Sequence, residues 1–463
     1  MFRRICAILA LTLPTAAAPG ADAATQTDWP AYLNGARHSS FNPTATTLTP
    51  ANADNLVRVL HWQDPSVIGL PPAGLFASPT VVDGVIYIGS NTGHFYALNE
   101  VTGKVLWDRF LGTTGHFRCR DKGITSTATV APDPSRNGQL TVYVGAGNGY
   151  LYALRASNGT TVWRAPVNVH SPDKNDKYNW SSPTVANGRV YMGISSQCDH
   201  PLTRGGVTSV AQATGGAPAT WYAVPDGEVG ASVWSSVAAT KAGVFVTTGN
   251  GSGDSFSIVR LDPMTLVKKD SWQIPGLAGS DTDIGASPTL LQANIGDQTV
   301  SMVAIIAKNT HLYALRSFSL SAGPLWEFNL HEGHCNGKGD AGAVAGATWD
   351  GSTLYAADGG TTIGGTCYLG GIRAFDPSTG DVQWQTGLGA KVFGTPTIDG
   401  AGLIGAPTFD DRVPNKEYLI DASDGSIINT INLDSPAFSQ AVFADTYVFA
   451  ATSSGDLASY TPA

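Results

Sequence analysis

Short apolar runs between turn residues dominate the pattern of hydrophobic and polar positions along the chain. Val85-Ile86-Tyr87-Ile88, which lies between Asp83-Gly84 and Gly89, is a clear example. Runs of this length that are rich in β-branched and aromatic residues predict strands. No segment keeps a helical period over several turns, so the pattern predicts an all-β fold.

One pattern of strands and turns recurs along the chain. It has a Ser-Pro-Thr start, a Val- and Tyr-rich run ending in Gly, a Tyr-Ala-Leu run, and a Thr-Gly turn followed by Trp. The copies are marked by Ser78-Pro79-Thr80 with Trp107, Tyr152-Ala153-Leu154 with Trp163, Ser182-Pro183-Thr184 with Trp221, Leu261-Asp262 with Trp272, Ser287-Pro288-Thr289 with Trp326, Phe375-Asp376 with Trp384, and Thr395-Pro396-Thr397 with Leu419-Ile420-Asp421. The spacing of about 40 to 55 residues is typical of four-stranded propeller blades.

The two ends of the repeat region complete one further blade. Seven units lie between about residues 76 and 430, and residues 441–460 hold three more strand-like runs. The missing fourth strand is Leu56 to Trp62. We therefore predict an eight-bladed β-propeller with four-stranded antiparallel blades, closed by N- and C-terminal strands that share one blade and leave no free sheet edge. Seven blades would fit if one repeat were divided wrongly. The predicted organisation is a signal peptide over 1–23, an extended segment over 24–55 and the propeller over 56–463.

The turn glycines and the tryptophans that follow them have a structural role in such repeats. Glycine supplies the positive φ of the hairpin, and the Trp packs between neighbouring blades. We assign most of the 11 tryptophans to this packing.

Composition narrows the class of function. Charged residues make up only 14% of the chain, the net charge is −9, and basic runs are absent. Nucleic-acid binding requires a positive patch on the phosphates, so the composition argues against it. No C-x-x-C-H motif is present, so the sequence encodes no covalent c-type haem.

The N-terminus resembles an export signal. Arg3 and Arg4 precede an apolar run from Ile5 to Leu13, and Ala21-Asp22-Ala23 offers a small-residue cleavage site. The run is too short to span a bilayer. We expect an exported protein, periplasmic or extracellular, that does not span the membrane; a buried N-terminal helix is the alternative.

Four cysteines remain after the predicted cleavage, and all four fall on one face of the propeller. Cys119 and Cys335 lie in links between blades, while Cys198 and Cys367 lie in loops between second and third strands. In a propeller these two kinds of loop share a face. An even number of cysteines in an exported chain favours disulfides, and we expect Cys335–Cys367 and Cys119–Cys198. The same face carries the longest loops, so we expect function there.

These repeats resemble those of pyrroloquinoline quinone (PQQ)-dependent alcohol dehydrogenases, especially the polyvinyl-alcohol dehydrogenase-like branch. The resemblance covers nearly all of the mature chain, beginning at Trp29-Pro30-Ala31-Tyr32 and continuing through Leu48-Thr49-Pro50-Ala51-Asn52 to Leu56 and Trp62. It implies a PQQ cofactor, a Ca²⁺ ion and an alcohol substrate, either a small molecule or a polymeric or secondary alcohol. A separate electron acceptor such as a cytochrome is also implied.

Two stretches are similar to the family's quinone and calcium segments. Gly230 to Trp234, followed by Thr247 to Asn250, implies that Trp234 stacks on the quinone and that Asn250 donates an amide oxygen to calcium. The stretch from Asp281 to Pro288 resembles the one that carries the catalytic carboxylate. The match favours Asp283 as general base and calcium ligand, with Asp281 as the alternative base.

Further residues are assigned by the same resemblance. Lys308 matches a cation beside the quinone oxygens, Lys122 matches a second basic contact, and Ser181 would offer a hydroxyl. Arg204 matches the end of the loop that carries a carboxylate calcium ligand, for which Asp199 is the nearest acidic residue and Gln197 competes.

The sequence also departs from the family, and other interpretations stay open. The adjacent cysteine pair of many relatives is missing, and so is an amide near Gly346. A packing Trp, turn-forming Asn and Asp residues and solvated lysines would explain the same residues without a cofactor. The alternative functions are a non-catalytic propeller that binds a protein or a glycan, and an enzyme whose metal is held by loop histidines.

Overall fold

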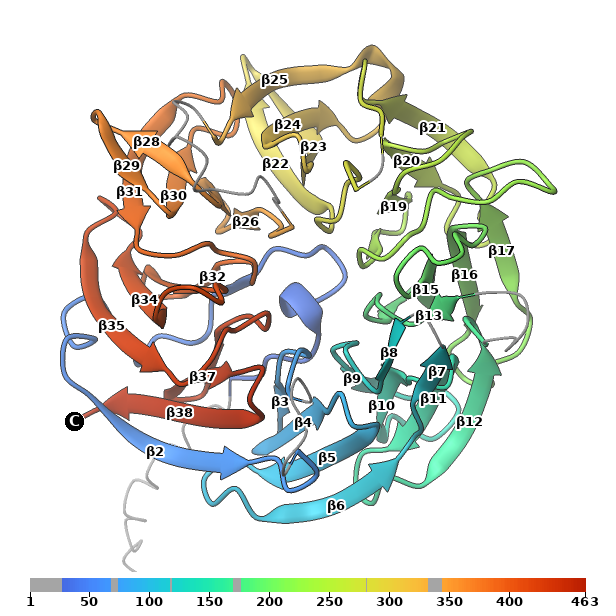
Figure 1. Ribbon diagram of the computed structural model, residues 1–463, viewed down its shortest axis with the longest axis horizontal. Helices are drawn as coiled ribbons and strands as arrows, with labels where there is room; N and C mark the ends of the chain where they lie inside the picture. Colours follow the sequence, from blue (N-terminus) through green and yellow to red (C-terminus); the bar gives the residue numbers. More distant parts are fainter. Residues whose placement is uncertain (1–26, 68–73, 117–118, 170–175, 280, 332–343) are drawn as a thin grey trace, which may run out of the picture.

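A computed structural model of the chain describes residues 27–67, 74–116, 119–169, 176–279, 281–331 and 344–463. Eight antiparallel sheets stand around one axis like the blades of a propeller, with the first strand of each blade nearest the axis (Figure 1). The two 3₁₀ turns, η1 (Tyr32–Asn34) and η2 (Leu320–Ala322), are the only helical elements in the described ranges. The prediction of an eight-bladed, four-stranded β-propeller is confirmed.

The first four blades follow the chain in order. Their strands are β3 (Thr80–Val82), β4 (Val85–Gly89), β5 (His94–Asn99) and β6 (Val105–Phe110); β9 (Thr129–Pro132), β10 (Leu140–Gly145), β11 (Tyr150–Arg155) and β12 (Thr161–Pro166); β14 (Thr184–Ala186), β15 (Arg189–Ser196), β16 (Gly206–Ala211) and β17 (Ala219–Tyr222); β18 (Ala238–Ala239), β19 (Val244–Thr247), β20 (Ser257–Leu261) and β21 (Lys268–Gln273). A short strand, β13 (Lys177–Tyr178), adds to β15, and a hairpin, β7 (Thr114–His116) and β8 (Cys119–Lys122), lies between blades one and two.

The last four blades complete the disc. Their strands are β22 (Thr289–Ile295), β23 (Gln298–Ile306), β24 (His311–Arg316) and β25 (Pro324–Asn329); β26 (Thr348–Trp349), β27 (Leu354–Asp358), β30 (Gly370–Phe375) and β31 (Val382–Leu388); β32 (Thr397–Asp399), β33 (Leu403–Pro407), β34 (Asn415–Asp421) and β35 (Ile427–Leu433); β36 (Val442–Ala444), β37 (Tyr447–Ala451), β38 (Asp456–Pro462) and β2 (Leu56–Gln63). The hairpin β28 (Thr361–Ile363) and β29 (Thr366–Tyr368) projects from blade six, and β1 (Phe41–Asn42) runs parallel to β32.

Blade eight joins the two ends of the propeller. Strand β2 pairs antiparallel with β38, in a register that runs from Leu56 opposite Pro462 to Gln63 opposite Asp456. The predicted closure is therefore confirmed. It pairs the backbone groups of β38 that would otherwise form an open sheet edge.

Four turn glycines lie against the tryptophan ring of the preceding blade. The ring of Trp107 lies against Gly159 of blade two, where a Cβ atom would come within 2.6 Å of the indole. Gly159 also has a φ of 67°, so both its backbone and its missing side chain are required there. The Trp107 Nε1–H donates to the carbonyl of Ala156 at 2.8 Å. Trp163, Trp326 and Trp384 repeat this contact on Gly215, Gly380 and Gly425.

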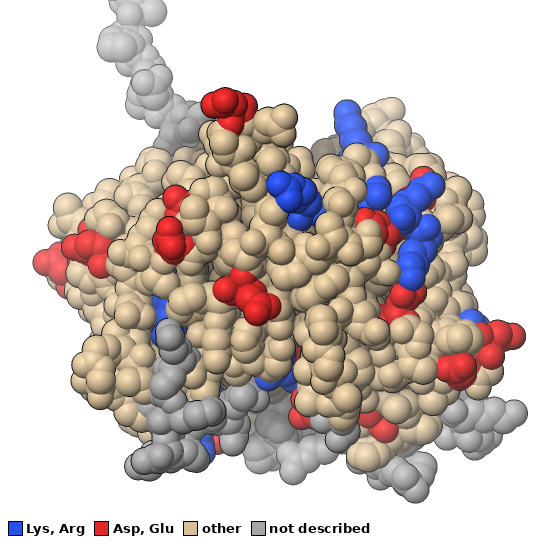
Figure 2. Space-filling view, turned by 90° about the horizontal axis from the view of Figure 1, so that it is seen from above, with Lys and Arg blue, Asp and Glu red and all other residues tan. Residues whose placement is uncertain are grey.

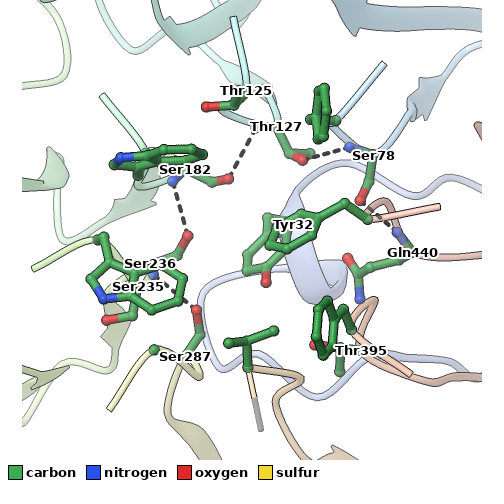
Figure 3. A pocket seen from close by; sticks show the side chains of 17 residues that line it. Tyr32, Ser78, Thr125, Thr127, Ser182, Ser235, Ser236, Ser287, Thr395 and Gln440 are labelled. Atoms are coloured by element: carbon green, nitrogen blue, oxygen red, sulfur yellow. Dashed lines mark hydrogen bonds between the residues drawn. The ribbon is translucent and has the colours of Figure 1, made fainter. Parts of the chain in front are cut away.

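The Ser-Pro-Thr starts form a ring of hydroxyl groups around the axis. In this hydroxyl ring the backbone N–H of one blade donates to the side chain of the next: Ser78 to Thr127 (2.9 Å), Thr127 to Ser182 (3.0 Å), Ser182 to Ser236 (2.9 Å), Ser236 to Ser287 (2.8 Å), Gly346 to Thr395 (2.8 Å) and Gln440 to Ser78 (2.9 Å). Figure 3 shows these groups lining a small pocket on the axis. The Pro of the motif begins a strand, where no backbone donor is needed.

The segment before β2 closes one end of the axial channel. Its carbonyls from Pro30 to Ser40 accept N–H groups from the innermost strands of blades two, four, five, six and seven. Tyr32, on η1, points into the hydroxyl ring (Figure 3). Burial raises the pKa of this phenol, while hydrogen bonds with Ser287 and Thr395 oppose the rise. The phenol thus lies between Ser287 and Thr395, the two ring residues on either side of Gly346.

The outer surface carries few charges. On the face seen in Figure 2, acidic side chains are scattered and basic ones gather toward one side, among mostly uncharged residues. No helix among the described residues is long and apolar enough to cross a membrane.

Candidate functional site

A cavity of about 340 Å³ lies on the axis at the end opposite to η1. Its inner end adjoins the hydroxyl ring, because Trp180, Trp234 and Phe393 line both spaces. Its outer part is formed by links between blades and by loops between second and third strands. This is the face on which the sequence predicted function.

One position of the repeat builds much of the cavity. It lies two residues before the ring position of each blade, and we call it the rim position. The eight rim residues are Phe76, Thr125, Trp180, Trp234, Gly285, Val344, Phe393 and Phe438. The Trp234 ring covers Gly285, where a Cβ atom would lie 2.0 Å from the indole. Gly285 therefore leaves room for Trp234 to lie flat over the next blade.

Asp283 is the most constrained charged group of the cavity. Its side chain is 8% exposed, and the Nε1–H of Trp234 donates to Oδ2 at 2.5 Å. The Lys308 ammonium lies 2.7 Å from Oδ1. An indole donor and an ammonium group on its two oxygens together fix the direction of this carboxylate.

Lys308 joins Asp283 to Asp281. Its ammonium also donates to Asp281 Oδ1, but that side chain is 87% exposed. Burial alone would lower the pKa of Lys308, yet Asp283 and Asp281 raise it above the ordinary lysine value. Lys308 therefore keeps its positive charge at neutral pH, 5.2 Å from the centroid of the Trp234 ring.

Asp199 brings a second carboxylate to the cavity from the loop after β15. The Ser196 hydroxyl donates to its Oδ1. Burial raises the pKa of the Asp199 carboxyl, and the carboxylates of Asp283 and Asp176 raise it further, against the Ser196 hydrogen bond. Two carboxylates that repel one another across a cavity provide oxygen ligands for a divalent cation, which would relieve that repulsion.

Lys122 supplies the remaining predicted cation. Its ammonium lies 4.7 Å from the Trp180 ring centroid and 5.6 Å from that of Phe76. We call Lys122, Asp199, Asp281, Asp283 and Lys308 the charged wall of the cavity.

Three predicted residues do not line the cavity. The Arg204 guanidinium binds the Val224 carbonyl and Asp226, and it stacks on the ring of Tyr222 at 4.1 Å. The Ser181 hydroxyl is buried and donates to the carbonyl of Ser182. These local bonds direct both side chains away from the cavity.

Asn250 is the third of these residues. Its backbone carbonyl accepts the Ala231 N–H at 2.6 Å, and the residue does not line the cavity. Gly249 itself faces Asp283, since a Cβ there would lie 3.4 Å from Oδ2. The predicted amide ligand is thus one residue removed from the carboxylate that it was expected to join.

A disulfide ties two loops beside the charged wall. Cys119 and Cys198 are bonded, with Cα atoms 6.2 Å apart, so this predicted pair is confirmed. Asp176 accepts the backbone N–H groups of Cys198 and His200 at 2.8 Å and 3.2 Å. The Asp199 loop is therefore held by a covalent and a hydrogen-bonded anchor. Cys367 is also disulfide-bonded, and its expected partner, Cys335, lies outside the described residues.

Four phenylalanines were missed by the sequence analysis. Phe76, Phe393 and Phe438 occupy rim positions, and Phe409 follows β33. The rim position itself was a usable signal, because Trp234 was recognised at the same place in its own repeat. Phe409 stands in a loop outside the repeat and has no such signal.

The residues present fit a flat quinone and a divalent cation. The ring of Trp234 is partly exposed to the cavity, Lys122 and Lys308 offer positive charge, and Asp199 and Asp283 offer oxygen ligands. Loop histidines form no metal cluster in the described ranges. The groups with metal-ligand spacing there are the disulfide pair with Asp176, and His61 with Asp434 and Asp456.

Comparisons with known proteins place the fold in a family. A family model described as outer membrane protein assembly factor BamB matches residues 60–236 and 315–463, well over half of the chain. A quinohemoprotein alcohol dehydrogenase from Comamonas testosteroni is 26% identical over 270 residues, which cover 48% of this chain but only 36% of that relative.

Solved structures agree on the architecture. The crystal structure of that dehydrogenase from Comamonas testosteroni superposes with a TM-score of 0.74 at 16% identity, covering 94% of this chain and 80% of the other. A europium-containing methanol dehydrogenase gives a TM-score of 0.70 at 14% identity, covering 91% and 89%. At these identities the superpositions show the fold alone. The match of the family model shows that the chain belongs to this family of PQQ-type β-propellers.

Proposed function

We propose that this chain is an oxidoreductase that oxidises an alcohol with PQQ and Ca²⁺. The observation that carries the proposal is the position of Asp283 between the indole N–H of Trp234 and the ammonium of Lys308, on one cavity wall with Asp199. A buried base, a flat aromatic surface and paired oxygen ligands are what such a reaction needs from a protein. The relatives named as alcohol dehydrogenases support the same assignment.

Positively and negatively charged side chains would both take part in cofactor binding. Trp234 would support the ring system of PQQ, and Lys122 and Lys308 would bind its negatively charged oxygens. Asp199 and Asp283 would hold Ca²⁺, with Asn250 reaching it only if the loop around Gly249 moves. When bound, PQQ would supply a hydride acceptor for the alcohol carbon, and Ca²⁺ would supply a Lewis acid beside it.

Asp283 takes the proton of the alcohol hydroxyl in this proposal. Its carboxylate is buried and fixed by two donors, so it presents an oxygen in one direction. The Asp281 side chain is 87% exposed, so water competes with a substrate for its oxygens. This difference supports Asp283 over Asp281 as the base.

Lys308 stabilises negative charge on the reacting groups. Its ammonium is nearly buried, so it acts where water screens little. It needs no change of protonation to do so, because the two aspartates raise its pKa.

Electron transfer and export complete the proposal. The electrons would pass to a separate acceptor such as a cytochrome, as the name of one relative, 1-butanol dehydrogenase (cytochrome c), supports. The predicted signal over 1–23 supports export to the periplasm or the medium. Polymeric and secondary alcohols remain proposed substrates.

A titration tests the cofactor assignment directly. Full-length protein is titrated with PQQ in the presence of Ca²⁺, and bound quinone is followed by its absorbance and by quenching of Trp fluorescence. Saturable one-to-one binding, its loss on chelation, and alcohol-dependent dye reduction are the expected results. In Trp234→Leu the affinity for PQQ should fall by about tenfold or more. Trp221→Leu, on the outer strand of blade three, should leave PQQ affinity unchanged.

The same titration separates the competing functions. Failure to bind PQQ at micromolar concentration would remove the dehydrogenase assignment and favour a binding scaffold. If metal analysis of the purified protein finds a tightly held ion other than Ca²⁺, that result would favour an enzyme whose metal is held by loop histidines.

A further inference from the structure

One side of the cavity consists of four phenylalanine rings. Phe393 stacks on Phe409 at a centroid distance of 5.3 Å and an interplanar angle of 21°. Phe409 meets Phe438 edge-on at 5.9 Å, and Phe438 meets Phe76 at 6.4 Å. We call these four residues the phenylalanine wall.

The phenylalanine wall is exposed to the cavity rather than buried in the propeller core. All four side chains are partly exposed, although the Ala and Gly that follow Phe76 and Phe393 are buried. Apolar surface left in contact with water costs about 25 cal/mol per Å², so four rings around one space are stabilised by an apolar occupant.

The rings themselves offer no hydrogen-bonding group to an occupant, and Val344 adds a further apolar side chain to the cavity lining. The charged groups that approach the rings are two cations, Lys122 at 5.6 Å from the Phe76 ring centroid and Lys391 at 5.8 Å from that of Phe393. A hydroxyl or carboxylate placed against four phenyl faces would lose its hydrogen bonds to water without replacement. The wall therefore disfavours a second hydroxyl or a carboxylate at the position that faces the rings.

We propose that the phenylalanine wall binds an aryl substituent of the alcohol, so that the preferred substrate is an arylalkyl alcohol such as a benzylic one. The inference rests on the proposed function, which places the substrate hydroxyl at Asp283. Both walls line one cavity, so one small molecule can present its hydroxyl to the charged wall and its ring to the phenylalanine wall. Offset and edge-on ring packing gives the aryl group preferred orientations.

The first test needs no turnover and no cofactor. Binding of 4-fluorobenzyl alcohol to the cofactor-free, full-length protein is measured by broadening of its fluorine NMR signal, with 2-fluoroethanol as the comparison. We expect saturable broadening for the aryl probe only. Phe409→Ala should weaken its binding about tenfold, and Phe110→Ala, an exposed phenylalanine on β6, should not change it. Equal binding of both probes, or an unaffected Phe409→Ala protein, overturns the inference.

The second test uses the PQQ- and Ca²⁺-loaded protein. In Phe409→Ala the KM for benzyl alcohol should rise about tenfold, while the KM for ethanol and the affinity for PQQ stay within about twofold. A fall in PQQ affinity instead would show that the wall serves the cofactor and would overturn the inference. If Phe409→Ala folds poorly, Phe409→Leu should give a smaller change in the same direction.

Failure of the proposed function has a different signature. In that case no PQQ binds and neither alcohol is oxidised by the unaltered protein. Oxidation of both alcohols with equal kcat/KM would keep the proposed function and reject the aryl site.

Discussion

The charged wall and the phenylalanine wall of the cavity are built on the same backbone repeat and carry opposite chemistry. Trp234, which orients Asp283, and Phe393, which stacks on Phe409, both occupy rim positions two residues before the ring position. Below them six of the eight ring positions carry a hydroxyl group, and the other two are Gly346 and Gln440. The propeller thus provides eight equivalent rim positions, and the side chain at each position determines the local chemistry of the cavity.

The difference between the walls comes mainly from the loops. Blades four and five contribute Asp281, Asp283 and Lys308 from one link and one loop, and blade three adds Asp199. Phe409, from the matching loop of blade seven, continues the rim phenylalanines instead. Reactivity and selectivity are therefore assigned to different blades, and separate substitutions can test each.

The largest expected effect is on the charged wall. Asp283→Asn keeps an oxygen for the Trp234 N–H but removes the base, so kcat should fall about 10² to 10⁴-fold for every alcohol. Steady-state dye reduction with benzyl alcohol and ethanol measures this loss, and PQQ titration checks that cofactor still binds. Asp281→Asn is the matched control and should keep kcat within a few-fold; the opposite ranking would make Asp281 the base.

A smaller loss is expected at Lys308. Lys308→Met removes the cation beside Asp283, and kcat should fall about 100-fold for both alcohols alike. Lys308→Arg keeps the charge and should recover most of the activity. A loss confined to benzyl alcohol would contradict the division between the two walls, because Lys308 belongs to the charged one.

The smallest effect concerns the ring beneath both walls. Ser236→Ala leaves the N–H of Ser182 without its acceptor, and Thr395→Val does the same to Gly346. Each should lower the free energy of unfolding by about 1–3 kcal/mol, measured by urea denaturation. Ser157→Ala, on an exposed turn, should be neutral. Unequal losses at the two ring sites would show that the scaffold is not uniform under the two walls.

The fold could be predicted from the sequence because each blade is marked by a few residues with a local structural role. Turn glycines, the tryptophans that pack on them and the Ser-Pro-Thr starts each have a fixed structural task. Even the split blade was predictable, since three runs at one end lacked a fourth.

The site was less predictable because its residues come from different blades and are brought together only by the closed propeller. Lys122, Asp199, Trp234, Asp281, Asp283 and Lys308 do line one cavity, as the resemblance implied. Arg204 was misplaced because its nearest partners, Asp226 and Tyr222, are set by tertiary contacts that no motif encodes. The phenylalanine wall was missed because each member looks like an ordinary core residue until the three blades are brought together.

The shared blade has a consequence for the order in which the site assembles. His61 of β2 and Asp456 of β38 are 395 positions apart along the chain, yet their side chains are 2.9 Å apart. Pairing of such remote segments is a slow event in folding, because a long loop must be closed first. Phe438 precedes β36 and Phe76 precedes β3, so these two rings come from the two ends of the chain that this pairing joins. An arc of blades without this pairing would hold Asp283 beside Lys308 but would leave the cavity open on one side, so the proposed selection of aryl alcohols would arise only when blade eight is complete.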